Sequence, residues 1–346
     1  MSPDPAPRAR GAGGELRLGV VGVGALGFHH ARILRDLPGV VMAGVHDIRP
    51  ERAREVEEAL GVRVHGTLEA LLDEVDALVV AVPTTAHEAV AVAALERGVH
   101  CLIEKPMAPS LEAADRILAA ARRSGALVQI GHVERFNSAI RAAEPYLDRP
   151  LFVESHRMAP FSPRSTDVAV VLDLMIHDVD LVRSLVGTNV TEIAASGVPV
   201  LTPNVDIASA RLTFEGGAVA NLTASRVSME RMRKLRIFQP SGYLSLNLAD
   251  GGGEFLRLKR GLPALEASGA SGAAPSWSGG LEGLVERIPL RGDGEEPLRK
   301  QLESFRAALE GKAPPAVSGE DGRDALALTL SIEARIASHV AHSRST

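Results

Sequence analysis

Over the first 130 residues, continuous apolar runs alternate with segments whose apolar residues recur every three to four positions. The continuous runs predict buried strands, and they lie at 16–21, 40–46, 77–82, 100–103 and 127–130, with a shorter one at 62–64. The segments between them have helical periodicity. Strand, turn and helix repeat without a break, which predicts an α/β fold with a doubly wound parallel sheet.

The polarity pattern changes in the second half of the chain. Helices are predicted at 138–147, capped by Asn137, and at 170–185. From residue 205 apolar and polar residues alternate, as in Ala208, Ala210, Leu212 and Phe214. This period of two predicts a mainly antiparallel open sheet with one polar face. Helices at 297–309 and 321–339 close the chain. We therefore predict a tail at 1–14, an α/β domain at 15–134 and an α+β domain at 135–346.

The turn after the first strand carries a glycine motif. Residues 16–27 read LRLGVVGVGALG, in which Gly22, Gly24 and Gly27 have the spacing G-x-G-x-x-G between a strand and a helix. This context is typical of a Rossmann dinucleotide-binding turn, where the glycines admit the pyrophosphate. The helix that begins at Ala25 and Leu26 directs its free N–H groups toward the phosphates.

Asp47 ends the second strand about twenty residues after Gly27, where a Rossmann unit holds the adenosine ribose. A carboxylate there accepts hydrogen bonds from the ribose hydroxyls and repels a 2′-phosphate. It therefore favours NAD over NADP as the cofactor, although a helix-capping role before Pro50 is the alternative. Arg49 is close enough in sequence to stack on the adenine or to weaken this discrimination.

Further polar residues follow the carboxyl ends of the predicted strands, where such sheets bind ligands. Pro83, Thr84 and His87 follow the strand at 77–82, Glu104 and Lys105 follow 100–103, and His132 follows 127–130. We assign the residues that follow the strands at 77–82 and 100–103 to the cofactor site. Lys105 is one of few lysines, and a cationic nicotinamide nearby would favour its neutral form, so it is a candidate proton acceptor.

The helix at 170–185 places Asp173 and His177 one turn apart, with Asp180 on the same stripe. Ionisable groups on an otherwise apolar helix indicate a site, with a solvent-facing polar stripe as the alternative. Two ligands at this spacing do not complete a metal shell, so no metal is predicted. The proline-broken segment 157–168 carries Arg157 and Arg164, which suit phosphate oxygens, unless they only face solvent.

The composition narrows the choice of partners. The net charge is −5, which argues against nucleic-acid or membrane-surface binding. Cys101 is the only cysteine, so no internal disulfide forms, and this fits a reducing compartment such as the cytoplasm. No apolar run reaches the roughly 20 residues of a membrane span. The segment 1–14 lacks the apolar centre of a secretory signal, and 261–280 is rich in Gly, Ala, Ser and Pro, as in a mobile loop.

Taken together, GVGALG at 22–27, Asp47, EKP at 104–106 and D-x-x-x-H-x-x-D at 173–180 resemble the Gfo/Idh/MocA family of NAD(P)-dependent oxidoreductases. The resemblance implies a two-domain sugar or cyclitol dehydrogenase. It implies that Lys105 is the catalytic lysine, that Asp173 positions the substrate and that His177 is the acid/base partner. It also implies that Glu104 approaches the nicotinamide ribose and that the Lys105–Pro106 bond is cis.

Within the family, the segments 132–137 and 157–181 are most similar to enzymes that oxidise C3 of UDP-N-acetylglucosamine on the route to amino sugars of lipid A. The resemblance makes His132, Arg135, Asn137, Arg157, Arg164, Asp173 and His177 the expected substrate residues. It implies a sugar or nucleotide-sugar substrate and a homodimer or homotetramer formed through the C-terminal sheet. A dehydrogenase of inositol or a free sugar, and a non-catalytic NAD(P)-binding regulator, are the alternatives.

Overall fold

The chain forms two compact units in a computed structural model that describes residues 14–162, 168–259 and 283–343. The first unit contains residues up to Phe136 together with 296–331. The second contains Asn137–Glu295 and the rest of the chain. The predicted tail other than Gly14, the predicted loop at 261–280, and Arg164 lie outside the described residues.

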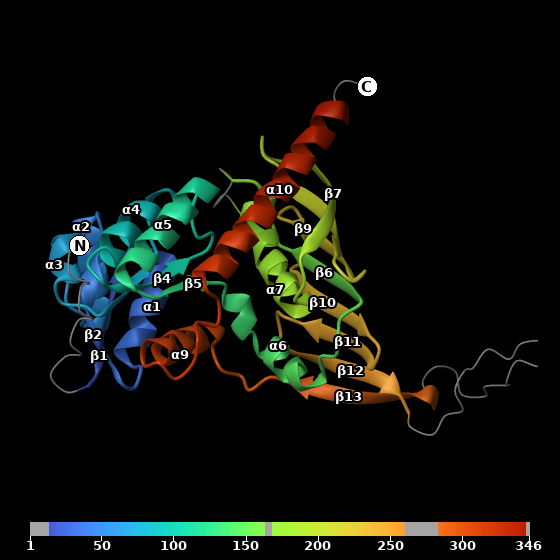
Figure 1. The fold of residues 1–346 in the computed structure, drawn as a ribbon, viewed down its shortest axis with the longest axis horizontal. Coiled ribbons are helices and arrows are strands. Elements are labelled where there is room, and N and C mark those ends of the chain that lie inside the picture. Colours follow the sequence, from blue (N-terminus) through green and yellow to red (C-terminus); the bar gives the residue numbers. More distant parts are fainter. Residues whose placement is uncertain (1–13, 163–167, 260–282, 344–346) are drawn as a thin grey trace, which may run out of the picture. The chain divides into compact units, whose positions relative to one another are not determined.

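A five-stranded parallel sheet forms the centre of the first unit, in the order β2-β1-β3-β4-β5 (Figure 1). Its strands are β1 (Leu16–Val21), β2 (Val40–His46), β3 (Ala77–Val80), β4 (His100–Glu104) and β5 (Val128–Gly131). Every residue of β3 is buried, as expected for a strand that helices cover on both faces. The predicted parallel sheet is confirmed. The predicted strand at 62–64 is reduced to one bridge between Val45 and Val64.

The helices of the first unit include two helical segments from the last fifty residues of the chain. They are α1 (Ala25–Arg35), α2 (Pro50–Leu60), α3 (Leu68–Leu72), α4 (Thr84–Leu95), α5 (Leu111–Ser124), the 3₁₀ helix η1 (Val133–Phe136), α9 (Pro297–Leu309) and the first part of α10 (Gly319–Ser343). Leu298, Leu302 and Phe305 of α9 pack in one core with β1 and α1. The first unit therefore extends beyond the predicted 15–134, because an apolar helix face does not reveal its packing partner.

An eight-stranded sheet dominates the second unit, in the order β13-β12-β11-β10-β6-β9-β8-β7. Only β6 and β9 pair in parallel, which confirms the predicted mainly antiparallel sheet. Burial alternates along β8 as predicted. The strands are β6 (Phe152–Met158), β7 (Val190–Val198), β8 (Ile207–Phe214), β9 (Val219–Ser225), β10 (Met232–Gln239), β11 (Gly242–Asn247), β12 (Gly252–Leu258) and β13 (Val285–Arg291).

Two helical segments of the second unit differ from their predicted form. The predicted helix at 170–185 begins as a π-helix, η3 (Val171–Met175), and continues as α7 (Ile176–Val186). The predicted helix at 138–147 is α6 (Ser138–Ala143) followed by the 3₁₀ helix η2 (Glu144–Tyr146). The α-helical part of this second segment ends early because Pro145 has no N–H to donate to the preceding turn.

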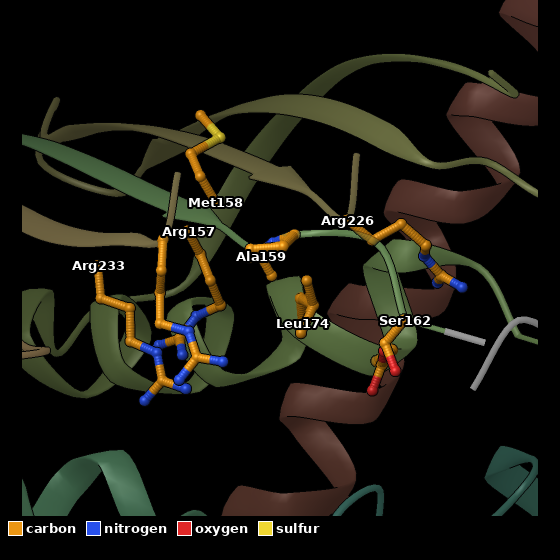
Figure 2. A pocket seen from close by; sticks show the side chains of 10 residues that line it. Arg157, Met158, Ala159, Ser162, Leu174, Arg226 and Arg233 are labelled. Carbon is orange, nitrogen blue, oxygen red and sulfur yellow. The ribbon is translucent and has the colours of Figure 1, made fainter. Parts of the chain in front are cut away.

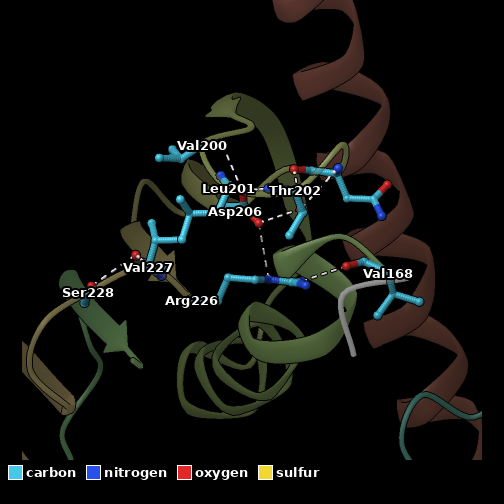
Figure 3. Close-up of polar contacts among 10 residues, drawn as sticks. Val168, Val200, Leu201, Thr202, Asp206, Arg226, Val227 and Ser228 are labelled. Carbon is cyan, nitrogen blue, oxygen red and sulfur yellow. Dashed lines mark hydrogen bonds and ion pairs between the residues drawn. The ribbon is translucent and has the colours of Figure 1, made fainter. Parts of the chain in front are cut away.

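Asp206 organises the connection between β7 and β8 (Figure 3). Its buried carboxylate accepts hydrogen bonds from the backbone N–H groups of Val200, Leu201 and Thr202 at 2.7–2.8 Å, and from the Thr202 hydroxyl. Nε of Arg226 lies 3.9 Å from the carboxylate. Burial by itself would raise the pKa of Asp206, but the hydrogen bonds from the loop outweigh it and lower the pKa to about 2.

We expect Asp206→Asn to lower the free energy of unfolding at pH 7 by about 2 kcal/mol. The folded-state pKa lies below the unfolded value, so this stabilisation is complete above about pH 4 and is lost as the pH falls toward 2. Urea unfolding at several pH values measures it. The exposed Asp148→Asn is the control. A gap between wild type and Asp206→Asn that stays constant from pH 7 to pH 2 would contradict the account.

Candidate active site

The glycine motif forms a tight turn at the carboxyl end of β1. Gly22 has a φ of +82°, and a Cβ there would lie 2.7 Å from the Ala81 carbonyl oxygen. A Cβ on Gly27 would overlap the carbonyl oxygen of Gly22, whereas a Cβ on Gly24 would meet nothing within 4 Å. Gly24 also precedes α1, which no side chain caps. The turn therefore leaves open space beside free helix N–H groups, which fits a pyrophosphate.

A cavity of about 620 Å³ lies beside this turn, at the carboxyl ends of β1, β2 and β3. The connection after β1 leads to β2 on one side, and the connection after the adjacent β3 leads to β4 on the other, so the cavity occupies the switch point of the sheet. Five of the predicted cofactor residues line it: Gly22, Gly24, Asp47, Arg49 and Pro83. Sequence reasoning missed its apolar walls, formed by Ile48, Leu68, Val82 and Val90. Such walls around one carboxylate fit an adenosine, so the residues present suit NAD.

Asp47 is held in place from two directions. One carboxylate oxygen accepts a hydrogen bond from the Val23 N–H at 2.9 Å, and the other accepts the Arg49 N–H at 2.9 Å. The Arg49 side chain adds a contact of 3.3 Å. Burial would raise the pKa of Asp47, but these hydrogen bonds and the Arg49 charge hold it below its usual value. The carboxylate is therefore ionised and fixed at the edge of the cavity.

His87 is held by contacts within the protein, and its role in cofactor binding stays a prediction. Its side chain is buried, and its ring nitrogens lie 3.0 Å from the Pro106 carbonyl oxygen and 2.9 Å from the Val82 carbonyl oxygen. Burial lowers the pKa of His87, so the ring is neutral at pH 7. His87 ties the loop after β3 to the turn after β4. His87 is not among the residues that line the cofactor cavity.

Glu104 is the last residue of β4 and Lys105 follows it. The peptide bond between Lys105 and Pro106 is cis, as the resemblance implied. The Glu104 carboxylate is buried, lies 2.7 Å from Nε2 of His30 on α1, and accepts the Lys105 N–H at 3.3 Å. Gly131 leaves room for it, since a Cβ there would lie 2.8 Å from the carboxylate.

The charge of Glu104 is stabilised despite its burial. Burial would raise its pKa, but His30 and Lys105 together hold the pKa below its usual value. These contacts hold the carboxylate in place, and its approach to the nicotinamide ribose stays a prediction. The Glu104 anion precedes Lys105 in the sequence and interacts electrostatically with its ammonium group.

We expect His30→Ala to lower the free energy of unfolding by about 3 kcal/mol, because it leaves a buried carboxylate without its partner. The neighbouring His29 is exposed, so His29→Ala is a matched control with an expected change below about 0.5 kcal/mol. Urea unfolding measures both. Equal effects of the two substitutions would show that the pair of His30 and Glu104 adds no stability.

A second cavity, of about 260 Å³, lies within the second unit (Figure 2). It is lined by Asp173 from η3, by the end of β6 and the segment after it, and by the start of β10. Four arginines line it: Arg157, Arg226, Arg231 and Arg233. The π-helical turn at Asp173 is wider than an α-helical turn, and such turns are frequent at functional sites. Asp173 thus shares its cavity with several cations.

Arg157 differs from its predicted place on a loop. It belongs to β6, is buried, and donates hydrogen bonds to both carboxylate oxygens of Asp178 on α7 at 2.8 and 3.0 Å. A bidentate pair of this kind neutralises the guanidinium. Asp178 is not part of the predicted polar stripe of Asp173, His177 and Asp180, so its pairing with Arg157 was not predicted.

The other predicted substrate residues are not among those that line this cavity. His177 is half-buried on α7, Asp180 is buried, and His132 is buried after β5. Arg135 belongs to η1 of the first unit. Asn137 uses its side chain within the protein: the oxygen accepts the Ala139 N–H at 3.0 Å, and the nitrogen donates to the Leu248 carbonyl at 2.8 Å. This confirms Asn137 as the predicted helix cap. Its role toward a substrate remains a prediction.

Within the described parts of the chain, no group of three or more His, Cys, Asp and Glu side chains is arranged to hold a metal ion. In the same residues, no helix has both the length and the apolar character needed to cross a membrane.

Comparison with known proteins identifies the class. Residues 16–132 match the model of the oxidoreductase family with an NAD-binding Rossmann fold, and residues 112–245 match the GFO/IDH/MocA C-terminal domain. The chain belongs to the GFO/IDH/MocA family of oxidoreductases. The predicted family, enzyme class and NAD cofactor are therefore confirmed.

Among its relatives is the UDP-N-acetylglucosamine 3-dehydrogenase of Acidithiobacillus ferrooxidans, 36% identical over 93% of this chain and 97% of the relative. A solved structure of that protein, GnnA, superimposes with a TM-score of 0.83 at 35% identity, covering 93% of this chain and 98% of the other. The myo-inositol 2-dehydrogenase of Thermotoga maritima is 26% identical over 90% of this chain and 94% of that protein.

Proposed function

We propose that this protein is an NAD-dependent dehydrogenase that oxidises the C3 hydroxyl of UDP-N-acetylglucosamine to a ketone. The observation that carries the proposal is the cavity that Asp173 shares with arginines, because it suits a sugar linked to negatively charged groups. Inositol and free hexoses carry no such charge. The similarity to the Acidithiobacillus enzyme over nearly the whole chain supports the same substrate.

Oxidation of a secondary alcohol removes a proton from oxygen and a hydrogen with its electron pair from carbon. NAD, when bound, supplies the acceptor for the electron pair. We propose that neutral Lys105 accepts the hydroxyl proton, that Asp173 orients the sugar, and that His177 assists in proton transfer. The Glu104 anion favours the ammonium that Lys105 becomes after accepting the proton, because opposite charges attract.

The substrate is tested with NAD and a panel of UDP-N-acetylglucosamine, UDP-glucose, N-acetylglucosamine and myo-inositol. NADH absorbance and product mass are the readouts, with an NADH-reoxidising system to draw an unfavourable equilibrium forward. We expect a product lighter by two hydrogens from UDP-N-acetylglucosamine. Oxidation confined to myo-inositol or the free sugar would contradict the substrate, and no oxidation of any compound would favour a nucleotide-sensing role.

Asp47 should set the preference for NAD. We expect the wild type to bind NAD more tightly than NADP, and Asp47→Ser to reduce this preference about tenfold or more by removing the repulsion of the 2′-phosphate. Titration of both cofactors against both proteins measures the ratio. Glu51→Ser, which changes a nearby acidic residue on α2, is the control. An unchanged ratio in Asp47→Ser would show that another residue makes the selection.

A further inference from the structure

We propose that Arg231, which directly precedes β10, and Arg233, near the start of β10, form the subsite for the diphosphate of a nucleotide-sugar substrate. The inference rests on the proposed function and names residues that sequence reasoning did not single out. Both line the cavity that contains Asp173. They replace Arg157 as the expected phosphate ligands in the described part of the chain.

The first argument is the state of the other two arginines in the cavity. Arg157 is buried in its bidentate pair with Asp178. Arg226 lies beside the Asp206 carboxylate and donates a hydrogen bond to the Val168 carbonyl oxygen at 2.7 Å. Both side chains are at most 6% exposed. Carboxylates therefore offset these two cations, which are fixed within the protein.

Arg231 is in a different situation. It is exposed, and no hydrogen bond or ion pair joins it to another described residue. Arg233, two residues later, is half-buried and lies directly opposite Arg157 in the pairing of β10 with β6. Figure 2 shows Arg157 and Arg233 extending from the sheet in the same direction. Arg231 and Arg233 therefore bring two guanidinium groups to the same cavity from one end of β10.

The second argument is the position of Asp173 in the same cavity. A carboxylate accepts hydrogen bonds from sugar hydroxyls, whereas guanidinium groups bind phosphate oxygens, often through two N–H groups. The cavity therefore has an acceptor for a polyol and donors for an anion within about 260 Å³. A sugar joined to a diphosphate combines both chemistries. This site lies in the second unit, whereas the glycine turn that suits the cofactor pyrophosphate lies in the first.

The test measures binding of UDP to the full-length protein in the presence of NAD by calorimetry. We expect Arg231→Gln with Arg233→Gln to raise the Kd of UDP about 30-fold or more, from the loss of charge-assisted hydrogen bonds. Arg231→Gln alone, at an exposed position, should raise it about fivefold even if the double variant does not fold. The control is Arg236→Gln, an arginine of β10 that contacts Glu154 and does not line the cavity. It should change Kd less than about twofold.

Kinetics separate this inference from the proposed function. In the double variant, KM for UDP-N-acetylglucosamine should rise about 30-fold with kcat within about threefold, because the diphosphate is remote from the reacting carbon. N-acetylglucosamine 1-phosphate, with one phosphate, should bind more weakly than UDP-N-acetylglucosamine and lose less on substitution.

One contrary result is that the wild type turns over UDP-N-acetylglucosamine while Arg231→Gln and the double variant keep its KM and the Kd of UDP unchanged. This result would overturn the subsite and leave the proposed function intact. Absence of turnover, with arginine-dependent binding of UDP, would overturn the proposed function and retain an anion subsite. Absence of UDP binding to the wild type would overturn the subsite directly.

Discussion

Lys105→Met should lower kcat by about 10²–10⁴ while the Kd of NAD changes only severalfold. Methionine has a similar length but cannot accept a proton. Lys105 follows β4 next to the buried Glu104, whereas the cavity that suits the adenosine of NAD is lined by other residues. Loss of the amine should therefore affect the chemical step and leave most of the cofactor contacts in place. Single-turnover kinetics and NAD titration measure the two quantities.

Two further substitutions distinguish proton transfer from simple charge. Lys105→Arg keeps a positive charge but cannot become neutral, so its kcat should fall to a similar extent. Lys312, which is exposed and pairs with Glu310, supplies the control Lys312→Met with unchanged kcat. If Lys105→Arg kept kcat within about tenfold of wild type, Lys105 would act through its charge and the assignment of a proton acceptor would be wrong.

Asp178→Ala should lower the free energy of unfolding by about 3–5 kcal/mol, because it leaves the Arg157 guanidinium buried without its carboxylate. Replacing both members, as Arg157→Met with Asp178→Leu, should recover much of the loss, since apolar residues of similar volume often substitute for a buried pair. Urea unfolding of the single and double variants measures the difference.

The pair of Arg236 and Glu154 provides the matched control. It joins β10 to β6, the strand that also carries Arg157, but its two side chains lie 3.4 Å apart and are both partly exposed. Glu154→Ala should therefore cost at most about 1 kcal/mol. A loss below about 1 kcal/mol for Asp178→Ala would mean that Arg157 finds another partner or solvent, and would return Arg157 to the set of candidate substrate ligands.

The sequence predicted the first unit well because its signals are local. Buried parallel strands are continuous apolar runs, and the spacing of Gly22, Gly24 and Gly27 between a strand and a helix is typical of a dinucleotide-binding turn. Asp47 and Lys105 each follow a strand, so the topology alone places them at the ligand-binding edge of the sheet.

The parts that sequence reasoning missed depend on contacts between distant residues or on small changes in geometry. His30 and Glu104 are 74 residues apart, and nothing in either local sequence indicates their pairing. The π-helical turn at Asp173 differs from an α-helix by one residue per hydrogen-bonded turn, which the apolar periodicity does not resolve. The packing of α9 in the first unit follows from core complementarity and not from its own amphipathic pattern.

The arginines illustrate the same limit. Arg157 and Arg233 are equally cationic in the sequence, and only the register of β6 and β10 and the position of α7 distinguish them. A guanidinium is fixed in a buried pair only when a neighbouring strand or helix places a carboxylate against it, as α7 places Asp178 against Arg157. The sequence order of charges does not contain that information.

The most direct test of the proposed reaction uses UDP-N-acetylglucosamine that carries deuterium at C3, together with unlabelled NAD. Oxidation at C3 predicts that the label leaves the sugar and is recovered in the reduced cofactor, which mass spectrometry detects as NADH heavier by one mass unit. The sugar product should then contain no deuterium. Formation of unlabelled NADH together with a keto sugar that keeps its deuterium would show that another carbon is oxidised and would contradict the account.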